Sequence, residues 1–202
     1  GLVAHRTSPT KIGLYLLAAL AAHDRGYIGT LSLVSRLGFA FDSLERLDRY
    51  RGHLLNWVDT RTLRPLQPGY ASTVDSGNLA ACLVILAQGC HELADEPVWP
   101  ATSWQGLRDA IAPVLDQVTG LTTSHTALAD FLEELDVRIA AAASDPVAWP
   151  DALRALLSDV RGGVPRLLAE LVETEGMDLD VGALTTLRLG EANPETIGLM
   201  PA

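Results

Sequence analysis

The run HRTSPTKIGLYLLAALAAHDRGYIGT, from His5 to Thr30, decides the fold of this chain. Ser8 is a good helix-capping residue, and Pro9 suits the first position of a helix because its fixed backbone angle is already helical. Gly26 is typical of a helix end. The run therefore predicts a helix that begins at Pro9 and stops before Gly26, with the polar cluster from His5 to Ser8 held at its mouth.

The composition favours an all-α fold. The chain has 202 residues, of which 48% are hydrophobic and only 5% aromatic, and leucine and alanine dominate. Leucine and alanine are strong helix formers. A chain of this length can bury about 70% of its unfolded surface, so its core needs neither disulfides nor metals.

The charge distribution argues against a nucleic-acid partner. The net charge is −10. Residues up to Asp75 include nine Lys and Arg and six Asp and Glu, whereas residues from Ser76 onward include six Lys and Arg and nineteen Asp and Glu. The acidic part would repel phosphates, and the first part lacks a basic stripe with interleaved aromatic residues.

The two cysteines and the absence of known binding motifs predict that the chain binds no metal and no cofactor. Cys82 and Cys90 would lie about 12 Å apart on one helix, which is too far for a disulfide. We expect both to be small core residues in a reducing compartment. The sequence contains no zinc-site spacing, phosphate-binding loop, dinucleotide fingerprint or nucleophile elbow.

No uninterrupted apolar run is long enough to span a membrane, which takes about 18 residues. The longest run, Ile12 to Ala22, has eleven residues. We expect no membrane-spanning segment. The chain starts with Gly rather than Met and shows no signal sequence, so we interpret it as an excised segment of a longer protein.

Apolar spacing predicts further helices along the chain. The second is expected from Thr30 to about Arg51, and the third from a cap at Asp75-Ser76 to a stop before Pro97. Between them, residues 53–70 should form an extended loop or short β-ribbon. Three later helices are expected at residues 103–118 with a kink or break at Pro113, 124–143, and 150–175 with an interruption near Gly162-Gly163. Residues 187–202 should be frayed or disordered.

Three places could carry chemistry, and each has a structural alternative. Asp75 is either a helix cap or part of a polar pocket at a helix mouth. Trp57 is either a platform for the apolar face of a sugar ring or a residue that closes the end of the core. His5-Arg6 is either a ligand-facing pair or a solvated lead-in to the first helix.

Three blocks of the sequence resemble the glucoamylase-like middle domain of bacterial cyclic β-1,2-glucan synthases. They are His5-Arg6-Thr7-Ser8-Pro9-Thr10 with Ile12-Gly13-Leu14-Tyr15-Leu16-Leu17, then Gly52-His53 and Asn56-Trp57 with Asp59-Thr60-Arg61, and finally Ser72-Thr73-Val74-Asp75-Ser76-Gly77-Asn78-Leu79-Ala80. The resemblance covers about His5 to Cys90. The chain departs from the pattern at Lys11, where Asn is usual, and at Leu55 and Val58, where aromatic residues are usual.

The resemblance implies helical hairpins that form part of an (α/α)6 toroid around a pocket. Residues 1–95 would be the first helices of that domain, 96–190 an acidic helical insertion, and 191–202 a disordered tail. The resemblance also implies cleavage and cyclisation of linear β-1,2-glucan by transglycosylation, which needs two carboxyl groups across the glycosidic bond. We expect those carboxylates to lie in later helices outside this chain.

The candidate saccharide-binding residues are Arg6, Trp57, Asp59 and Asp75. The expected partners are a β-1,2-glucan oligosaccharide and the other domains of the parent enzyme, on the cytoplasmic side of the inner membrane, and exposed apolar helix faces should favour self-association. Two alternatives remain open. The chain could be a non-catalytic helical module that mediates contacts between domains or subunits, or part of a hydrolase of the same glucan.

Overall fold

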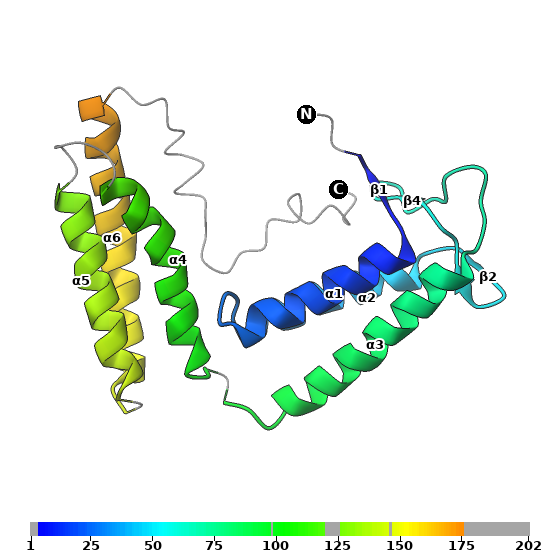
Figure 1. Ribbon diagram of the computed structural model, residues 1–202, viewed down its shortest axis with the longest axis horizontal. Coiled ribbons are helices and arrows are strands. Elements are labelled where there is room, and N and C mark those ends of the chain that lie inside the picture. The colour runs from blue at the N-terminus through cyan, green and yellow to red at the C-terminus, as the bar shows by residue number, and fades with distance from the viewer. Residues whose placement is uncertain (1–3, 98, 120–125, 146, 176–202) are drawn as a thin grey trace. The chain divides into compact units, whose positions relative to one another are not determined.

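The computed structural model describes residues 4–97, 99–119, 126–145 and 147–175, which form six α-helices and four strands of two residues each (Figure 1). The predicted all-α class is confirmed. The chain divides into two compact units: one contains the residues up to Asp24 with Ile28–Trp99, and the other contains Arg25–Tyr27 with the described residues from Pro100 onward.

Helix α1, Pro9–Asp24, has the predicted bounds. The carbonyl oxygen of Ser8 accepts a hydrogen bond of 3.0 Å from the backbone N–H of Ile12, and its hydroxyl accepts one of 3.4 Å from the N–H of Lys11. Gly26 follows the helix with φ 74°, a conformation that suits glycine. The capping reading of Ser8-Pro9 is therefore confirmed.

Small residues let α1 pack closely against helix α3, Thr73–Leu93. A Cβ atom on Gly13 would lie 2.9 Å from both Cβ and Sγ of Cys82, and one on Gly89 would meet the side chain of Leu20. Larger side chains would force the two helices apart. The core of this unit continues onto α2, and its buried members are Ile12, Leu16, Ala19, Leu20, Leu33, Leu37, Ala40, Leu44, Leu47, Leu54, Val58, Leu63, Leu79 and Leu86.

Helix α2, Thr30–Glu45, is shorter than predicted. Strand β2, Arg49–Tyr50, pairs antiparallel with β3, His53–Leu54, in a hairpin. The two residues between them, Arg51 and Gly52, have φ values of 49° and 87°. Positive φ at both positions is typical of the tight turn that matches the twist of a hairpin. The prediction that α2 reaches Arg51 is therefore wrong. Residues 53–70 contain only the short strands β3 and β4, Val58–Asp59, which agrees with the predicted extended loop or short β-ribbon.

The start of α3 lies two to three residues before its predicted cap at Asp75-Ser76. Ser72 is the capping residue, because its hydroxyl accepts a hydrogen bond of 3.1 Å from the backbone N–H of Asp75. Asp75 is thus the third residue of the helix and completes a Ser-x-x-Asp pattern that resembles a capping box. The assignment of Asp75 as the cap is wrong.

The two cysteines on α3 are both free thiols, as predicted, but only Cys82 is buried. Cys90 is exposed, so the prediction that both fill the core is wrong. Cys82 lies on the face that meets α1, together with Leu79 and Leu86.

Helix α3 is long and apolar enough to cross a membrane by length and composition. The sequence analysis missed this helix because it counted only uninterrupted apolar runs. Core helices pass the same test, so the expectation that no segment spans a membrane stays a prediction. Asn78 and Gln88 interrupt the run in α3 without adding charge. One face of α3 packs on α1, and several of its other apolar side chains are open, with Val84 71% and Ile85 54% exposed.

The second unit consists of α4 (Thr102–Thr119), α5 (Thr126–Ala143) and α6 (Trp149–Glu175). All three predicted helices are confirmed, and Pro113 lies inside α4. The predicted interruption near Gly162-Gly163 is absent. Instead, Gly163 lies so close to the Phe131 ring that a Cβ atom there would be 2.9 Å from it. This glycine allows two helices to pack closely rather than ending one.

The core of the second unit is built from α4, α5 and α6. Trp104 is 1% exposed, and its ring meets that of Trp149 edge to face with 5.7 Å between the centroids. The other buried apolar residues of this unit include Leu128, Leu132, Leu135, Ile139, Ala142, Leu156 and Leu167. The predicted frayed tail, residues 187–202, lies outside the described residues.

Candidate functional site

Strands β1, Arg6–Thr7, and β4, Val58–Asp59, bring the first two resembling blocks together. They pair antiparallel, with Arg6 opposite Asp59 and Thr7 opposite Val58. Thr7 and Val58 are buried, and Arg6 is exposed. Because successive side chains of a strand point to opposite faces, Arg6 and Asp59 share the outer face of this pair.

Trp57 precedes β4 in an unusual backbone conformation. Its φ is 59°, in the left-handed region that costs a residue with a side chain about 1 kcal/mol or more. The carbonyl oxygen of Trp57 accepts a hydrogen bond of 2.7 Å from the N–H of Leu66, and the neighbouring Asn56 N–H donates to the carbonyl of Tyr70, also at 2.7 Å. These two bonds hold the backbone of the loop on both sides of Trp57.

Two cationic groups lie over the ring of Trp57. The guanidinium carbon of Arg6 is 5.0 Å from the ring centroid, and Nζ of Lys11 is 5.3 Å from it. Both distances are within the range of cation–π attraction. The ring therefore links β1 to the first turn of α1. Lys11, which was not among the predicted site residues, belongs to this cluster.

Asp75 joins the N-terminal ends of α1 and α3. The hydroxyl of Thr10 donates a hydrogen bond of 2.7 Å to Asp75 Oδ1 and accepts one of 3.0 Å from Asn78 Nδ2. Hydrogen bonds from the hydroxyls of Ser72 and then Thr10 hold the pKa of Asp75 below its ordinary value of 3.8. Asp75 is therefore ionised at neutral pH and committed to contacts within the chain.

The carboxylate of Asp59 also accepts its hydrogen bonds from nearby residues of the same loop. Its Oδ1 accepts hydrogen bonds from the backbone N–H of Arg61 at 2.8 Å and of Thr62 at 3.0 Å, and Oδ2 lies 3.4 Å from the Arg61 guanidinium. These contacts, the Arg61 N–H first, lower the pKa of Asp59. The side chain fixes the turn after β4 in the manner of an Asx turn.

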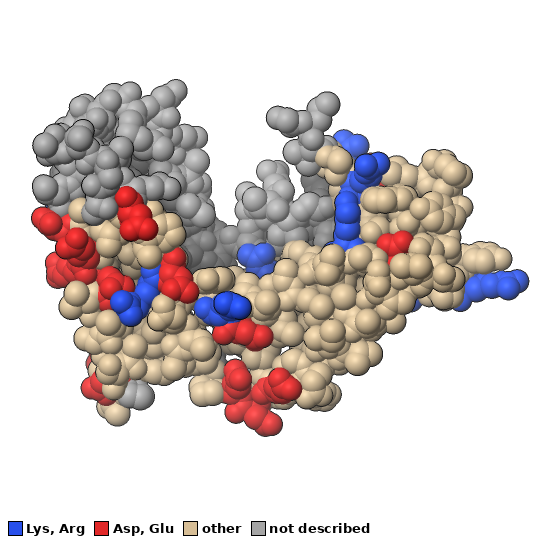
Figure 2. Space-filling view, in the orientation of Figure 1, with Lys and Arg blue, Asp and Glu red and all other residues tan. Residues whose placement is uncertain are grey.

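The three predicted segments meet at the N-terminal end of α1. β1 brings Arg6, the loop before β4 brings Trp57, and the first turn of α3 brings Asp75 into contact with Thr10. Figure 2 shows Lys and Arg side chains in a column on the face where β1 runs in Figure 1. The structure therefore brings all four predicted residues to one region.

The region contains the cations of Arg6 and Lys11, the indole ring of Trp57 and the hydroxyl of Thr10. A catalytic acid in glycoside cleavage needs a raised pKa, and both carboxyl groups of the region have lowered ones. Among the described residues, no group of three or more His, Cys, Asp or Glu side chains is arranged to hold a metal ion. Neither Asp59 nor Asp75 therefore has the raised pKa that a catalytic acid needs.

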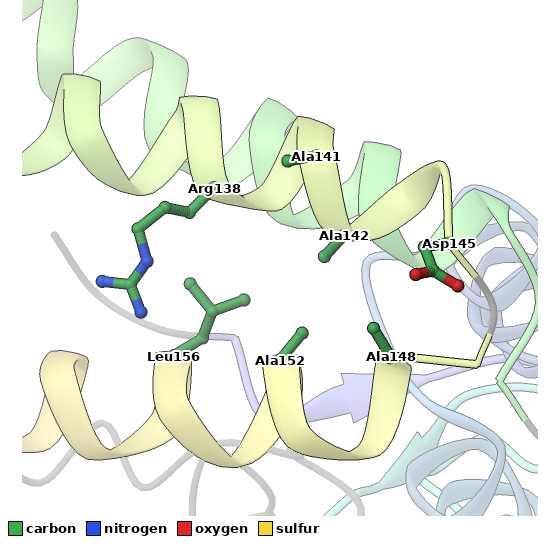
Figure 3. Close-up of a pocket in the computed structure, with 7 residues that line it drawn as sticks. All are labelled: Arg138, Ala141, Ala142, Asp145, Ala148, Ala152 and Leu156. Atoms are coloured by element: carbon green, nitrogen blue, oxygen red, sulfur yellow. The ribbon is translucent and has the colours of Figure 1, made fainter.

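A separate hollow of about 310 Å³ lies between α5 and α6 in the second unit. Arg138 and Asp145 stand at its two ends, with small apolar side chains between them (Figure 3). The Arg138 guanidinium is paired with Asp159 at 2.6 Å. The hollow is lined by Arg138, Ala141, Ala142, Asp145, Ala148, Ala152 and Leu156. Because alanine side chains from both sides make up most of its lining and its cation is already paired, it offers few groups to a ligand.

No family model matches the chain. Over 112 residues, which are 55% of the chain, it is 44% identical to the cyclic β-(1,2)-glucan synthase NdvB of Rhizobium meliloti (strain 1021). The match spans 4% of the length of that protein. The chain therefore resembles a small part of a much longer enzyme, in agreement with the resemblance found from the three sequence blocks.

Proposed function

We propose that this chain is the N-terminal portion of the cyclisation domain of a cyclic β-1,2-glucan synthase. It contributes helices and one part of a saccharide-binding rim, and it is inactive by itself. The observation that carries this proposal is the meeting of Arg6, Trp57 and the Thr10–Asp75 pair at one end of α1, in a chain 44% identical over 112 residues to part of such an enzyme.

In this proposal, residues 1–95 are the first helices of an (α/α)6 toroid and residues 96–190 an acidic helical insertion. Helices α1 and α3 have apolar residues on almost every side, which is typical of helices buried on all faces in the complete domain. The polar helix mouths would then face the central pocket, where the glucan binds. The whole enzyme would be anchored at the inner membrane, with this domain on the cytoplasmic side.

The saccharide contacts in this proposal come from the outer face of β1 and from the Trp57 loop. An aromatic ring can stack on the apolar face of a sugar, and neighbouring polar groups can bind its hydroxyls. Arg6 would donate to hydroxyl or ring oxygens. Asp59 and Asp75 are already satisfied within the chain, so their main part is to position the loop and the helix mouth.

The lack of activity follows from the carboxyl groups. Transglycosylation with retention needs a proton donor and a nucleophile at a set separation. Asp59 and Asp75 accept several hydrogen bonds each and have lowered pKa values, so neither fits the proton donor. Incubation of the chain with linear β-1,2-glucan should give no cleaved or cyclised product, and robust turnover would overturn this part of the proposal.

The binding part is tested by calorimetric titration with β-1,2-linked glucose oligosaccharides. Trp57→Gly removes the ring while keeping a residue that adopts φ 59° without strain. Arg51→Gly is the matched control, because it relieves a similar positive φ away from the ring. We expect Trp57→Gly to weaken binding by about tenfold, the loss typical of an aromatic contact, and Arg51→Gly to leave it unchanged. Equal affinities for both variants would contradict the proposal.

One observation favours a second candidate function, a helical module that mediates contacts between domains or subunits. The face of α3 away from α1 carries exposed apolar residues, including Val74, Val84 and Ile85. Exposed apolar patches of this kind mark contact surfaces. If the oligosaccharides give no heat while the chain associates with itself or with the rest of the parent enzyme, this second function replaces the first.

A further inference from the structure

Asn78 is an exposed residue of α3 whose side-chain amide is held by a hydrogen-bond relay. Its Nδ2 donates a hydrogen bond of 3.0 Å to the hydroxyl of Thr10, and that hydroxyl donates one of 2.7 Å to Asp75 Oδ1. The relay therefore runs from α3 to α1 and back to α3. A side chain that the fold already orients loses less conformational freedom when a ligand binds it.

The charge of Asp75 decides which end of the Asn78 amide faces Thr10. Asp75 is ionised at neutral pH, because its pKa lies below the ordinary value of 3.8. An ionised carboxylate only accepts hydrogen bonds, so the Thr10 hydroxyl gives its single proton to Asp75 and can only accept from Asn78. The amide nitrogen of Asn78 therefore faces Thr10. Its Oδ1 and its second Nδ2 hydrogen make no hydrogen bond within the described part of the chain.

A side-chain amide with an open oxygen and an open N–H matches two neighbouring hydroxyl groups of a sugar. The oxygen accepts from one hydroxyl, and the N–H donates to the oxygen of the next. An internal unit of a β-1,2-linked glucan keeps such a pair, the 3- and 4-hydroxyls. The free hydroxyls of an internal β-1,3-linked unit are not on neighbouring carbons. An amide of this kind can therefore distinguish the two linkages.

Asn78 is bonded to the part of α1 that contacts the Trp57 ring. Thr10 directly precedes Lys11, whose Nζ lies 5.3 Å from the centroid of that ring. We propose that Asn78 is a further saccharide-binding residue, which favours β-1,2-linked over β-1,3-linked glucan by binding two neighbouring hydroxyls. Thr10 and Asp75 are its positioning residues. This inference rests on the proposed saccharide-binding function and adds to it a residue that determines the linkage.

The experiment is calorimetric titration of the full chain with a β-1,2-linked and a β-1,3-linked glucose hexasaccharide. The β-1,3-linked probe keeps neighbouring hydroxyl pairs only in its two end units, so we expect the wild type to bind it more weakly. Asn78→Ala should weaken binding of the β-1,2-linked probe by about tenfold, the loss expected for two neutral hydrogen bonds, and of the β-1,3-linked probe by less than about threefold. Gln88→Ala is the matched control and should change neither affinity, since Gln88 is an exposed amide of the same helix that bonds to Glu92.

Two variants of Thr10 separate ligand recognition from a merely structural role of the relay. Thr10→Ser keeps the hydroxyl and should keep the preference for the β-1,2-linked probe. Thr10→Val has a similar size but no hydroxyl, and it should reduce the preference by about threefold because Asn78 loses its fixed orientation. The thermal midpoint reports folding independently. Asn78→Ala should leave that midpoint unchanged or raise it, because alanine favours a helix more than asparagine does.

Each outcome bears on one proposal or the other. If the wild type and Asn78→Ala bind the β-1,2-linked probe equally well, this inference is overturned and the saccharide function stands. The same holds if Asn78→Ala weakens both probes by the same factor, or if its only effect is a lower thermal midpoint. If the wild type binds neither probe, the proposed function itself is overturned.

Discussion

Thr10 Oγ1 donates a hydrogen bond of 2.7 Å to Asp75 Oδ1, although 65 positions separate the two residues in the chain. This bond connects the first turn of α1 to the first turn of α3. The same carboxylate is bonded by Ser72, which caps α3. Asp75 therefore stabilises two helix starts at once, and it fixes the place where the polar segments of the candidate site meet.

Replacing Asp75 should destabilise the chain. Asp75→Asn removes the negative charge near two helix N-termini and weakens the bonds to Thr10 and Ser72. We expect the free energy of unfolding to fall by about 1–2 kcal/mol, as measured by urea denaturation followed by circular dichroism.

The matched control for this change is Asp151→Asn. Asp151 also lies in the first turn of a helix, α6, but its side chain is 87% exposed and pairs only locally with Arg154. We expect its replacement to change the free energy of unfolding by less than about 0.5 kcal/mol. If both variants lose the same stability, the Thr10–Asp75 link is not important for the fold.

The contribution of Asp75 should depend on pH. Its pKa is lowered in the folded chain, so the unfolded chain binds the proton more readily. The stabilisation by Asp75 is thus complete well above pH 3.8, the ordinary value, and decreases as the pH falls below 3.8 through the lowered folded-state pKa. Urea unfolding should be measured for the wild type and Asp75→Asn between pH 2 and 6. The difference between their free energies of unfolding should be constant near pH 6 and should shrink toward pH 2.

The close approach of α1 and α3 depends on Gly13. Alanine there would place a Cβ atom 2.9 Å from Cys82, too close for either helix to keep its position. We expect Gly13→Ala to lower the free energy of unfolding by about 1–3 kcal/mol, measured by chemical denaturation.

Gly38→Ala is the control for Gly13→Ala. Gly38 lies within α2 with nothing within 4 Å of the added Cβ atom. There alanine should raise the stability by up to about 1 kcal/mol, because it favours the helix more than glycine does. A stabilising effect of alanine at Gly13 as well would mean that α1 and α3 do not pack as described.

Self-association should depend on the open face of α3. Light scattering of the chain is expected to show dimers or larger species, and the double variant Val84→Gln/Ile85→Gln should shift them toward monomers. Val147→Gln is the control, since Val147 is 91% exposed but lies outside the helices. A wild-type chain that is monomeric at high concentration would contradict this prediction.

The sequence predicted the helices well where capping residues and apolar spacing agreed, as at Pro9–Asp24. It failed at the end of α2 because apolar spacing continues to Leu47, whereas the tight turn at Arg51-Gly52 ends the pattern. The hairpin forms because β2 pairs with β3, and the spacing of apolar residues along the chain cannot predict that pairing. At α3, the Ser-x-x-Asp pattern from Ser72 was a recognisable signal that the choice of Asp75 as cap missed.

The candidate site was predicted in part. The polar clusters at Arg6, Trp57, Asp59 and Asp75 pointed to residues that the fold does bring to one end of α1. The sequence could not show that the carboxylates of Asp59 and Asp75 accept hydrogen bonds from groups of the chain itself. Those contacts depend on the geometry of the loops. The sequence also gave no sign that Lys11 lies over Trp57. The direction of the Lys11 side chain depends on the position of the first turn of α1 relative to the Trp57 loop.

The most direct test of the account is an NMR titration of the isotope-labelled chain with a neutral β-1,2-linked glucose oligosaccharide. The account predicts saturable shifts at the Trp57 indole and at the backbone amides of Arg6 and Asp75, with the α5–α6 hollow around Ala152 unaffected. Absence of shifts at the Trp57 loop, or shifts confined to the α5–α6 hollow, would contradict the claim that the meeting of β1, the Trp57 loop and the start of α3 forms a saccharide-binding site.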